Sequence, residues 1–295
     1  KLNPIYVDCN NNFNIDINDL TLRLNSFAQG KKPKVLVVQH TFGLPVNMDE
    51  IMNIAKENNL IVVEDCAHAL GAKFNNQYVG TFGKAAFFSF SRDKVISCIY
   101  GGMAVTNDDE TGKKLLELQK KFGKPSLFWI KQQLMHPVFL NYVILPLYKL
   151  LDLGKVILIL SQWTHLLSKA VSWKEKRGLK PQYFPKALPN ALAIVAQNQF
   201  NKLGKFNNHR QKLAEFYFKE LQNTKFILPP PNGIFLRFAV QHPKAQEIIY
   251  ESWHKENILL GDWYTTPIAP DDTKMEEIKY ENGMCKNAEK LSKVT

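Results

Sequence analysis

The pattern of apolar and polar positions changes character along the chain, and its first part predicts strands that alternate with helices. Four apolar runs rich in β-branched or aromatic residues have the length of buried strands, at residues 34–40, 60–67, 84–91 and 102–107. Between the first two, apolar residues recur at helical spacing over 47–59, where Asn47 and Glu50 have the spacing of a capping box. Another helix is predicted at 108–122. Continuous apolar strands separated by a helix of this length predict a mainly parallel, buried α/β sheet.

The later parts of the chain follow other patterns. Residues 125–172 form a long stretch rich in leucine, aromatic residues and lysine. A helical region then covers 188–222, followed by a predicted strand, helix and strand at 233–241, 245–258 and 259–264. This order predicts a second, smaller α+β domain. We therefore expect a large domain at 1–120, a basic, apolar helical insertion at 121–186 and a small domain at 187–295.

The cysteines and the first residues bear on the cellular compartment. No two of the four cysteines have a paired spacing; they are Cys9, Cys66, Cys98 and Cys285. This argues against a disulfide framework or a zinc site, so we expect no metal and a reducing, cytoplasmic location. The opening residues lack the features of a signal peptide and an initiator methionine, and we expect the sequence to be a fragment.

The positive charge is concentrated in one segment. Residues 111–186 contain 14 lysines and arginines against three acidic residues, so this segment holds the whole net charge of +11. Such an excess serves solubility in the simplest interpretation. The sharper alternatives are a nucleic acid, an anionic lipid surface or a phosphorylated substrate.

Three polar side chains stand where they could meet at one edge of the predicted sheet. Asp65 ends one strand, Ser89 lies within the next, and Lys94 follows just beyond it. Taken alone, Asp65 is more simply a helix cap, Lys94 a surface lysine and His68 a packed histidine. Together, a carboxylate, a hydroxyl group and an amine are the groups that a pyridoxal phosphate (PLP) site requires.

Residues 61–108 strengthen that interpretation, because they resemble a known signature. The segment reads IVVEDCAHALGAKFNNQYVGTFGKAAFFSFSRDKVISCIYGGMAVTND. It resembles the core of the DegT/StrS family of PLP-dependent sugar aminotransferases, which runs E-D-x-A-x-A-x-G-A, a glycine-rich turn, S-F, a lysine, G-G and T-N-D. The residues that match are Glu64, Asp65, Ala67, Ala69, Gly71, Ala72, Gly80, Gly83, Ser89, Phe90, Lys94, Gly101, Gly102, Thr106, Asn107 and Asp108. The resemblance covers about residues 4–120 and 187–291.

The resemblance implies the fold and the role of each site residue. The fold would be that of fold-type I PLP enzymes, with a partial, mainly parallel large domain. Lys94 would form the Schiff base with PLP, and Asp65 would pair with the pyridine nitrogen. Ser89 would donate to the phosphate, His68 would lie beside the phenolic oxygen and Ala67 against the ring face.

Departures from the family pattern concern the ends of the chain and the subunit interface. The N-terminal phosphate cup and the closing C-terminal segment of the family are missing, which supports the expectation of a fragment. Pro185 stands where many members carry an asparagine that reaches the phosphate of the neighbouring subunit. Lys186 is a candidate substitute in the homodimer that the resemblance implies.

The resemblance also implies an activity. We expect transfer of an amino group from an amino acid, commonly glutamate, to a nucleotide-linked keto-sugar in cell-surface polysaccharide or amino-sugar biosynthesis. The sugar dehydratases of the same family are an alternative, but they carry histidine in place of the lysine at Lys94. A non-catalytic binding protein is a second alternative; no helix-turn-helix, RNA-recognition or zinc-finger pattern accompanies the basic segment, so we expect no nucleic acid.

Two interpretations of residues 125–172 remain open. Pro146, Lys149 and Asp152 interrupt the apolar run before about 20 residues accumulate, which argues against a transmembrane helix. The segment is either an insertion packed on its own domain or at a dimer interface, or a peripheral anchor on the inner face of a membrane.

Overall fold

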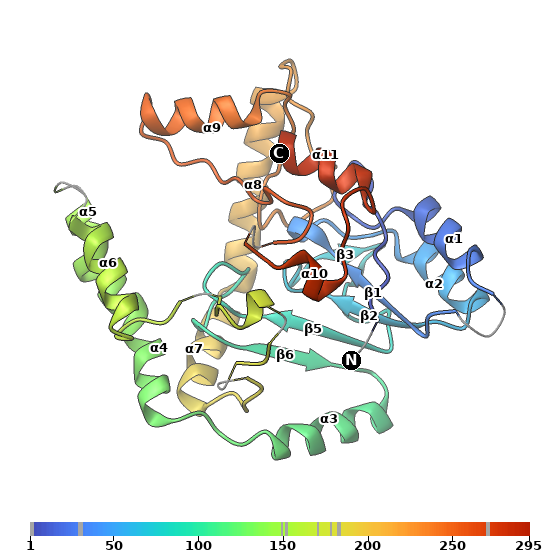
Figure 1. The fold of residues 1–295 in the computed structure, drawn as a ribbon, viewed down its shortest axis with the longest axis horizontal. Coiled ribbons are helices and arrows are strands. Elements are labelled where there is room, and N and C mark those ends of the chain that lie inside the picture. Colours follow the sequence, from blue (N-terminus) through green and yellow to red (C-terminus); the bar gives the residue numbers. More distant parts are fainter. Residues whose placement is uncertain are drawn as a thin grey trace.

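A four-stranded sheet forms the centre of the molecule (Figure 1). The computed structural model describes residues 3–28, 32–148, 150, 153–169, 171–177, 179–181, 184–269 and 272–295. The sheet has the order β1-β2-β5-β6, with bounds Val35–Gln39, Ile61–Asp65, Ala85–Ser89 and Gly102–Val105. The first three strands are parallel and β6 runs antiparallel to β5, so the predicted mainly parallel sheet is confirmed. A short hairpin of β3 (Lys73–Phe74) and β4 (Gln77–Tyr78) lies outside this sheet.

Two helices cover β1 and β2, and each begins at a capping side chain. The Asp16 carboxylate accepts from two backbone N–H groups of α1 (Ile17–Asn25). The Asn47 side chain accepts from Glu50 N–H at the start of α2 (Met48–Glu57), which confirms the predicted N-cap. The buried faces of both helices pack against the strands in one core of Leu20, Leu24, Leu36, Val38, Val46, Met48, Ile51, Ala55 and Val62.

A second core joins the strand ends to the later helices. It contains Ala86 and Phe88 of β5, the segments that follow β2 and β5, and Leu192 of α7 (Asn190–Phe200). The long helix α8 (Leu203–Leu221) adds partly buried side chains to this core. The segments that follow β2 and β5 carry His68 and Lys94, so this core fixes where these two candidate residues lie.

Residues 109–148 and 153–163 form helices that lead away from the sheet. The predicted helix at 108–122 is observed as α3 (Asp109–Lys121), capped by Asp108. Then follow α4 (Leu127–Phe139), a π-helical turn (Leu140–Ile144), α5 (Leu145–Tyr148) and α6 (Leu153–Trp163), which project as an arm at the left of Figure 1. None of the helices formed by described residues is long and apolar enough to cross a membrane. Lys149 and Asp152 lie outside the described residues.

The C-terminal part is helical, with irregular segments between its helices. Its remaining helices are α9 (Ala245–His254), α10 (Met275–Ile278) and α11 (Lys286–Val294). The strands predicted at 233–241 and 259–264 are wrong; the described part after residue 187 contains one isolated bridge, between Ile227 and Gln241. The prediction fails because residues 233–236 are buried at consecutive positions and Phe235 has a φ of 51°, which a strand does not allow. The division at 120 and 186 stays a prediction.

Candidate active site

Lys94 and His68 meet at the carboxyl ends of β5 and β2. Lys94 lies in the segment that links β5 to β6, and its Nζ is 3.0 Å from His68 Nε2. Two backbone bonds close the base of this segment, from Phe90 N to Gly101 O at 2.8 Å and from Cys98 N to Phe90 O at 2.9 Å. The lysine side chain is 16% exposed. The structure thus brings together two residues that lie 26 positions apart.

The protonation of His68 follows from its other contact. The backbone N–H of Phe42 donates to His68 Nδ1 at 3.3 Å, so in the neutral ring the proton is on Nε2. Burial, helped by the positive charges of Lys94 and Arg237, lowers the pKa of His68 to about 4. His68 is therefore neutral near pH 7, and its Nε2 lies within hydrogen-bond distance of the Lys94 amine.

Asp65 ends β2 close to this pair. Its carboxylate accepts from Ala67 N–H at 3.0 Å, which orients it. Burial raises the pKa of Asp65, while that hydrogen bond and the charge of Lys94 act in the opposite direction. Lys94 forms an ion pair with Asp93, at 3.7 Å. Asp65 lies close enough for the charge of Lys94 to act on its pKa, but it is not the ion-pair partner of the lysine.

Ser89 lies at the end of β5, beside the end of β2. Its Oγ is 3.1 Å from Ser91 Oγ and accepts from Ser91 N–H at 3.5 Å. The register pairs Asp65 with Phe87, which places Ser89 just past the strand neighbour of the carboxylate. Two hydroxyl groups and an N–H group so close together can donate to an anion such as a phosphate.

Aromatic side chains that sequence reasoning missed surround the histidine and the lysine. The ring of Phe42 stacks on His68 with centroids 6.1 Å apart, and Tyr264 stacks on the same phenylalanine at 5.8 Å. The ring of Trp263 lies 5.8 Å from Lys94 Nζ and 5.1 Å from the Arg237 guanidinium. A cavity of about 1030 Å³ borders the site at Phe42, Trp263 and Tyr264. The sequence did contain one signal for this part of the site, because Arg237 is the single charged residue of the apolar run at 233–240.

Helix α8 holds the two segments that carry the lysine and the histidine. Arg210 Nη2 donates to Val95 O at 2.8 Å, next to Lys94. Asn207 Nδ2 donates to Leu70 O at 3.1 Å, two residues after His68, and its side-chain oxygen accepts from Arg210 at 3.0 Å. The two side chains form one bridge, so the helix fixes the lysine segment relative to the histidine segment.

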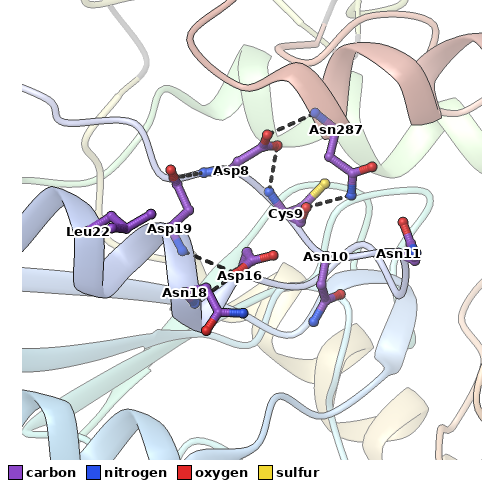
Figure 2. Close-up of a pocket in the computed structure, with 9 residues that line it drawn as sticks. All are labelled: Asp8, Cys9, Asn10, Asn11, Asp16, Asn18, Asp19, Leu22 and Asn287. Carbon is purple, nitrogen blue, oxygen red and sulfur yellow. Dashed lines mark hydrogen bonds between the residues drawn. The ribbon is translucent and has the colours of Figure 1, made fainter.

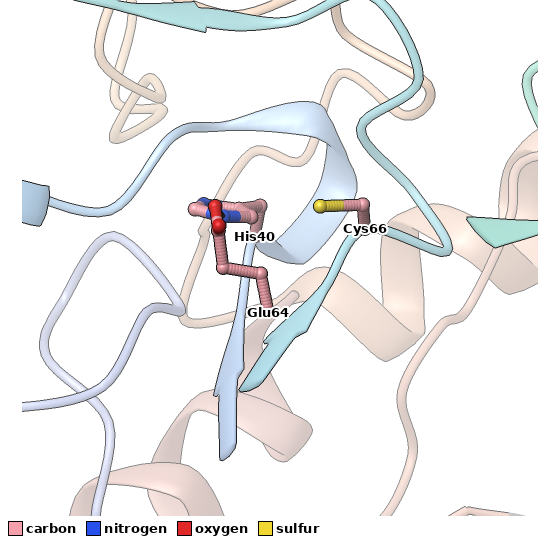
Figure 3. A group of neighbouring side chains, drawn as sticks. All are labelled: His40, Glu64 and Cys66. Carbon is pink, nitrogen blue, oxygen red and sulfur yellow. Dashed lines mark hydrogen bonds and ion pairs between the residues drawn. The ribbon is translucent and has the colours of Figure 1, made fainter. Parts of the chain in front are cut away.

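A buried cluster of His40, Glu64 and Cys66 lies beneath the site (Figure 3). Val46 N–H donates to His40 Nδ1, so His40 Nε2–H donates to Glu64, at 3.2 Å. Glu64 also accepts from the backbone N–H groups of Gly80, Phe82 and Gly83. Burial opposes ionisation, but these hydrogen bonds outweigh it and lower the pKa of Glu64. Since both partners are satisfied, we interpret the cluster as a support for the end of β2 and not as a metal site.

A polar pocket of about 380 Å³ near the N-terminal segment has a structural explanation as well (Figure 2). Asp8 accepts from the backbone N–H groups of Asn287 and Ala288, at 2.8 and 2.9 Å. Asp16 caps α1, and Asp19 accepts from Asp8 N–H and pairs with Arg23. Because every carboxylate has donors within the protein, the pocket fastens segments of the chain together.

Lys186 has an exposed side chain, and its Nζ lies near Gly123, just after α3. The predicted contact of Lys186 with the phosphate of a neighbouring subunit stays a prediction, as do the roles of Asp65, Ala67, His68, Ser89 and Lys94.

The donor set at the strand ends fits PLP. Lys94 offers an amine, Asp65 a half-buried carboxyl group and His68 a ring nitrogen. Ser89 and Ser91 offer hydroxyl groups to a phosphate. An acid, an amine and phosphate donors are the groups that this cofactor uses. Ala67, half-buried after β2, lies within the same group of residues.

Comparison with known proteins gives consistent matches. The model of the DegT/DnrJ/EryC1/StrS aminotransferase family matches residues 1–135 and 172–295. GDP-perosamine synthase of Escherichia coli O157:H7 is 41% identical over 106 residues, which cover 36% of this chain and 28% of that protein. The UDP-N-acetyl-3-dehydro-alpha-D-glucosamine 3-aminotransferase of Acidithiobacillus ferrooxidans is 26% identical over 269 residues, covering 90% of this chain and 58% of that protein.

The fold has solved counterparts. The structure of Helicobacter pylori PseC, an aminotransferase involved in the biosynthesis of pseudoaminic acid, superimposes with a TM-score of 0.68. The two are 20% identical, and the match covers 99% of this chain and 66% of that chain. At this identity the likeness establishes the fold, which is that of the fold-type I PLP enzymes, as predicted. The chain spans less than two thirds of the length of these relatives.

Proposed function

This chain belongs to the DegT/DnrJ/EryC1/StrS aminotransferase family, and we propose that it is a PLP-dependent aminotransferase. The amino group would move from an amino acid, with glutamate as the donor, to a nucleotide-linked keto-sugar. The observation that carries the proposal is the amine of Lys94, 3.0 Å from His68 Nε2 and beside the half-buried carboxyl group of Asp65. The names of the two relatives, which refer to GDP- and UDP-linked sugars, support this class of substrate.

The residues of the chain divide the work of the reaction among them. PLP, when bound, supplies an electron sink for the carbon that loses its proton. Lys94 Nζ would accept that proton and return it to the product. Asp65 would pair with the pyridine nitrogen and keep it protonated, and Ser89 and Ser91 would hold the phosphate. Phe42, Trp263 and Tyr264 exclude water from the lysine.

The dehydratase alternative is disfavoured by the same residue. In that branch of the family a histidine replaces the lysine, whereas this chain has Lys94 at the matching position. His68 lies beside that amine, with its Nε2 3.0 Å from Lys94 Nζ.

We also propose the assembly and location in which the enzyme works. The enzyme would act in the cytoplasm as a homodimer, in which the exposed Lys186 reaches the phosphate site of the neighbouring subunit. Residues 125–172 would contact the inner face of a membrane, which the concentration of positive charge around this segment supports.

Substitution of Lys94 tests the activity. Lys94→Ala should abolish both the visible absorption band of bound PLP and the transfer of an amino group from glutamate to a panel of nucleotide-linked keto-sugars. Asp65→Asn should retain bound PLP but lower turnover by about 10²-fold or more, because the ring nitrogen loses its charged partner.

The control is Lys114→Ala, which removes an exposed lysine of α3 and should change neither property. Borohydride reduction followed by peptide mapping locates the cofactor. A label on a lysine other than Lys94, or full activity of Lys94→Ala, would show that the assignment is wrong.

A further inference from the structure

The arm formed by residues 127–148 and 153–163 exposes large apolar side chains and buries several polar ones. Besides Ile144, it buries Gln133 and His136 of α4 and Ser161 of α6. Large apolar side chains point outward instead: Phe128, Met135, Val138, Tyr142, Ile159 and Trp163. Tyr142 is 80% exposed and Trp163 is 78% exposed. A helix in water normally has the opposite arrangement, so the outer face of the arm is suited to apolar surroundings.

The exposed apolar residues are ordered along the arm. Phe128, Met135 and Val138 lie at intervals of seven and three residues on α4, which places them on one face of the helix. The one residue of that row with a charge is Lys131, which is also exposed. A long lysine side chain can lie along apolar surface with its amine at the edge, so the row forms a continuous apolar stripe.

Within the arm, the backbone of α6 closely approaches the backbone of the π-helical turn and of α5. A Cβ atom added at Gly154 would lie 2.2 Å from Ile144 O and 2.8 Å from Tyr148 N. Ser161, another small residue of α6, is buried as well. Close packing through small residues, with the large side chains directed outward, is the arrangement of helices in an apolar medium.

The root of the arm is fixed to the body by polar contacts. Arg92, two residues before Lys94, donates to Ser168 O at 3.0 Å and to Ser168 Oγ at 2.6 Å. The hydroxyl of Ser168 in turn donates to Gln133 Oε1 at 2.9 Å. Gln133, on the buried side of the arm, is thus linked to Arg92 of the body through Ser168.

We propose that the outer face of this arm lies on an anionic membrane surface. This inference rests on the membrane contact proposed above and specifies which face of the protein makes it. Charge complementarity selects this occupant, because the exposed lysines around the arm include Lys124, Lys131, Lys155 and Lys169. The aromatic residues Tyr142 and Trp163 are of the type that occupies the headgroup boundary. The arm lies along the surface, since none of the described helices has the length and apolarity to cross it.

This face is distinct from the shared aminotransferase machinery. The family model matches up to residue 135 and again from 172, so most of the arm lies outside what the family has in common. A second copy of the chain is the other occupant to consider. It would bring two segments with the same positive excess together, which like-charge repulsion opposes.

Vesicle flotation tests the proposal with the intact protein. At low salt the protein should float with phosphatidylcholine vesicles that contain phosphatidylglycerol, and at least tenfold less with phosphatidylcholine alone. Triple substitution of Phe128, Tyr142 and Trp163 by serine should reduce flotation by at least tenfold. The matched control substitutes three exposed apolar residues elsewhere, Leu22, Tyr250 and Leu259, by serine and should float like the unchanged protein.

A second variant keeps the result interpretable if the triple variant folds poorly. Lys131→Glu with Lys155→Glu leaves the apolar side chains in place and should also reduce flotation with anionic vesicles by several-fold. Equal flotation of all variants, no flotation at low salt, or a change of oligomeric state as the sole effect of the triple substitution would overturn the proposal. Bound PLP and transferase activity are measured in the same preparations. If the unchanged protein bound no PLP and showed no transferase activity, the proposed function would be contradicted, while the result on lipid binding would stand.

Discussion

At the scale of single residues, one hydrogen bond defines the state of the candidate active site. The backbone of Phe42 determines which nitrogen of His68 carries the proton, and that nitrogen is the one 3.0 Å from Lys94. A protonated imidazole would place a positive charge against the amine in a buried space. The site therefore depends on a histidine that stays neutral over the physiological pH range.

This dependence predicts how stability changes with pH. The pKa of His68 is about 4 in the folded protein and 6.5 in its ordinary state, so between these values the unfolded chain binds more protons. The contribution of the neutral His68 to the free energy of unfolding should be fully present above about pH 6.5. The free energy of unfolding should then fall by about 3 kcal/mol as the pH approaches 4. Urea unfolding of the cofactor-free protein at pH 7 and pH 4.5 measures the difference.

Substitution isolates the contribution of this histidine. His68→Gln should flatten the pH dependence without abolishing it, because burial and the charge of Arg92 also lower the pKa of His136 to about 4. His209→Gln, at an exposed position of α8, serves as the matched control. An unchanged slope in His68→Gln would contradict the argument.

The residues of the site differ in how far the sequence could predict them. Lys94, Asp65, His68 and Ser89 lie within about 30 positions of one another in a recognisable signature, and the structure brings their segments together. Trp263 and its aromatic neighbours come from segments far away in the chain. No local pattern encodes such a contact, because only tertiary packing creates it.

At the scale of elements, the prediction succeeded where local signals agree with the tertiary structure. The strands of the sheet and the capped helices α2 and α3 combine periodicity with turn and cap residues. Residues 233–241 carry strand-like composition, but their apolar side chains serve two different cores. Ile234 and Leu236 belong to the core around the strand ends, whereas Phe235 packs with Phe218. Packing demands from several sides override β propensity in such a segment.

The bridge from α8 to the lysine segment gives a prediction at this scale. Arg210→Met removes the bond to Val95 O and leaves that carbonyl and the Asn207 side chain without their donor. The free energy of unfolding should fall by about 1–3 kcal/mol. Hydrogen exchange should increase at residues 91–99 above all, because the helix no longer holds them. Lys212→Met, at an exposed position of the same helix, is the control; uniform exchange throughout the molecule in Arg210→Met would argue against a local tether.

At the scale of the whole molecule, distant parts of the chain are joined at the polar pocket of Figure 2. The carboxylate of Asp8 lies at the start of α11 and accepts two of the N–H groups that have no partner within the helix. Asn287 Nδ2 returns a bond to Cys9 O at 2.7 Å, and Tyr6 OH donates to Ile278 O. The N-terminal segment thus supplies the cap that α11 lacks, since its own N-cap residue, Cys285, makes no side-chain capping bond.

This arrangement predicts that Asp8 stabilises the last helix from a position almost 280 residues away. Asp8→Ala should lower the free energy of unfolding by about 1 kcal/mol, the usual cost of a lost cap and its interaction with the helix dipole. The loss should appear first as faster hydrogen exchange within residues 286–294, while the segment that carries Lys94 exchanges as before. Asp262→Ala removes an exposed acid outside the pocket and should change neither quantity. Protection of α11 that persists in Asp8→Ala would mean that packing of its buried side chains, Leu291 and Ser292, is sufficient to hold the helix without the cap.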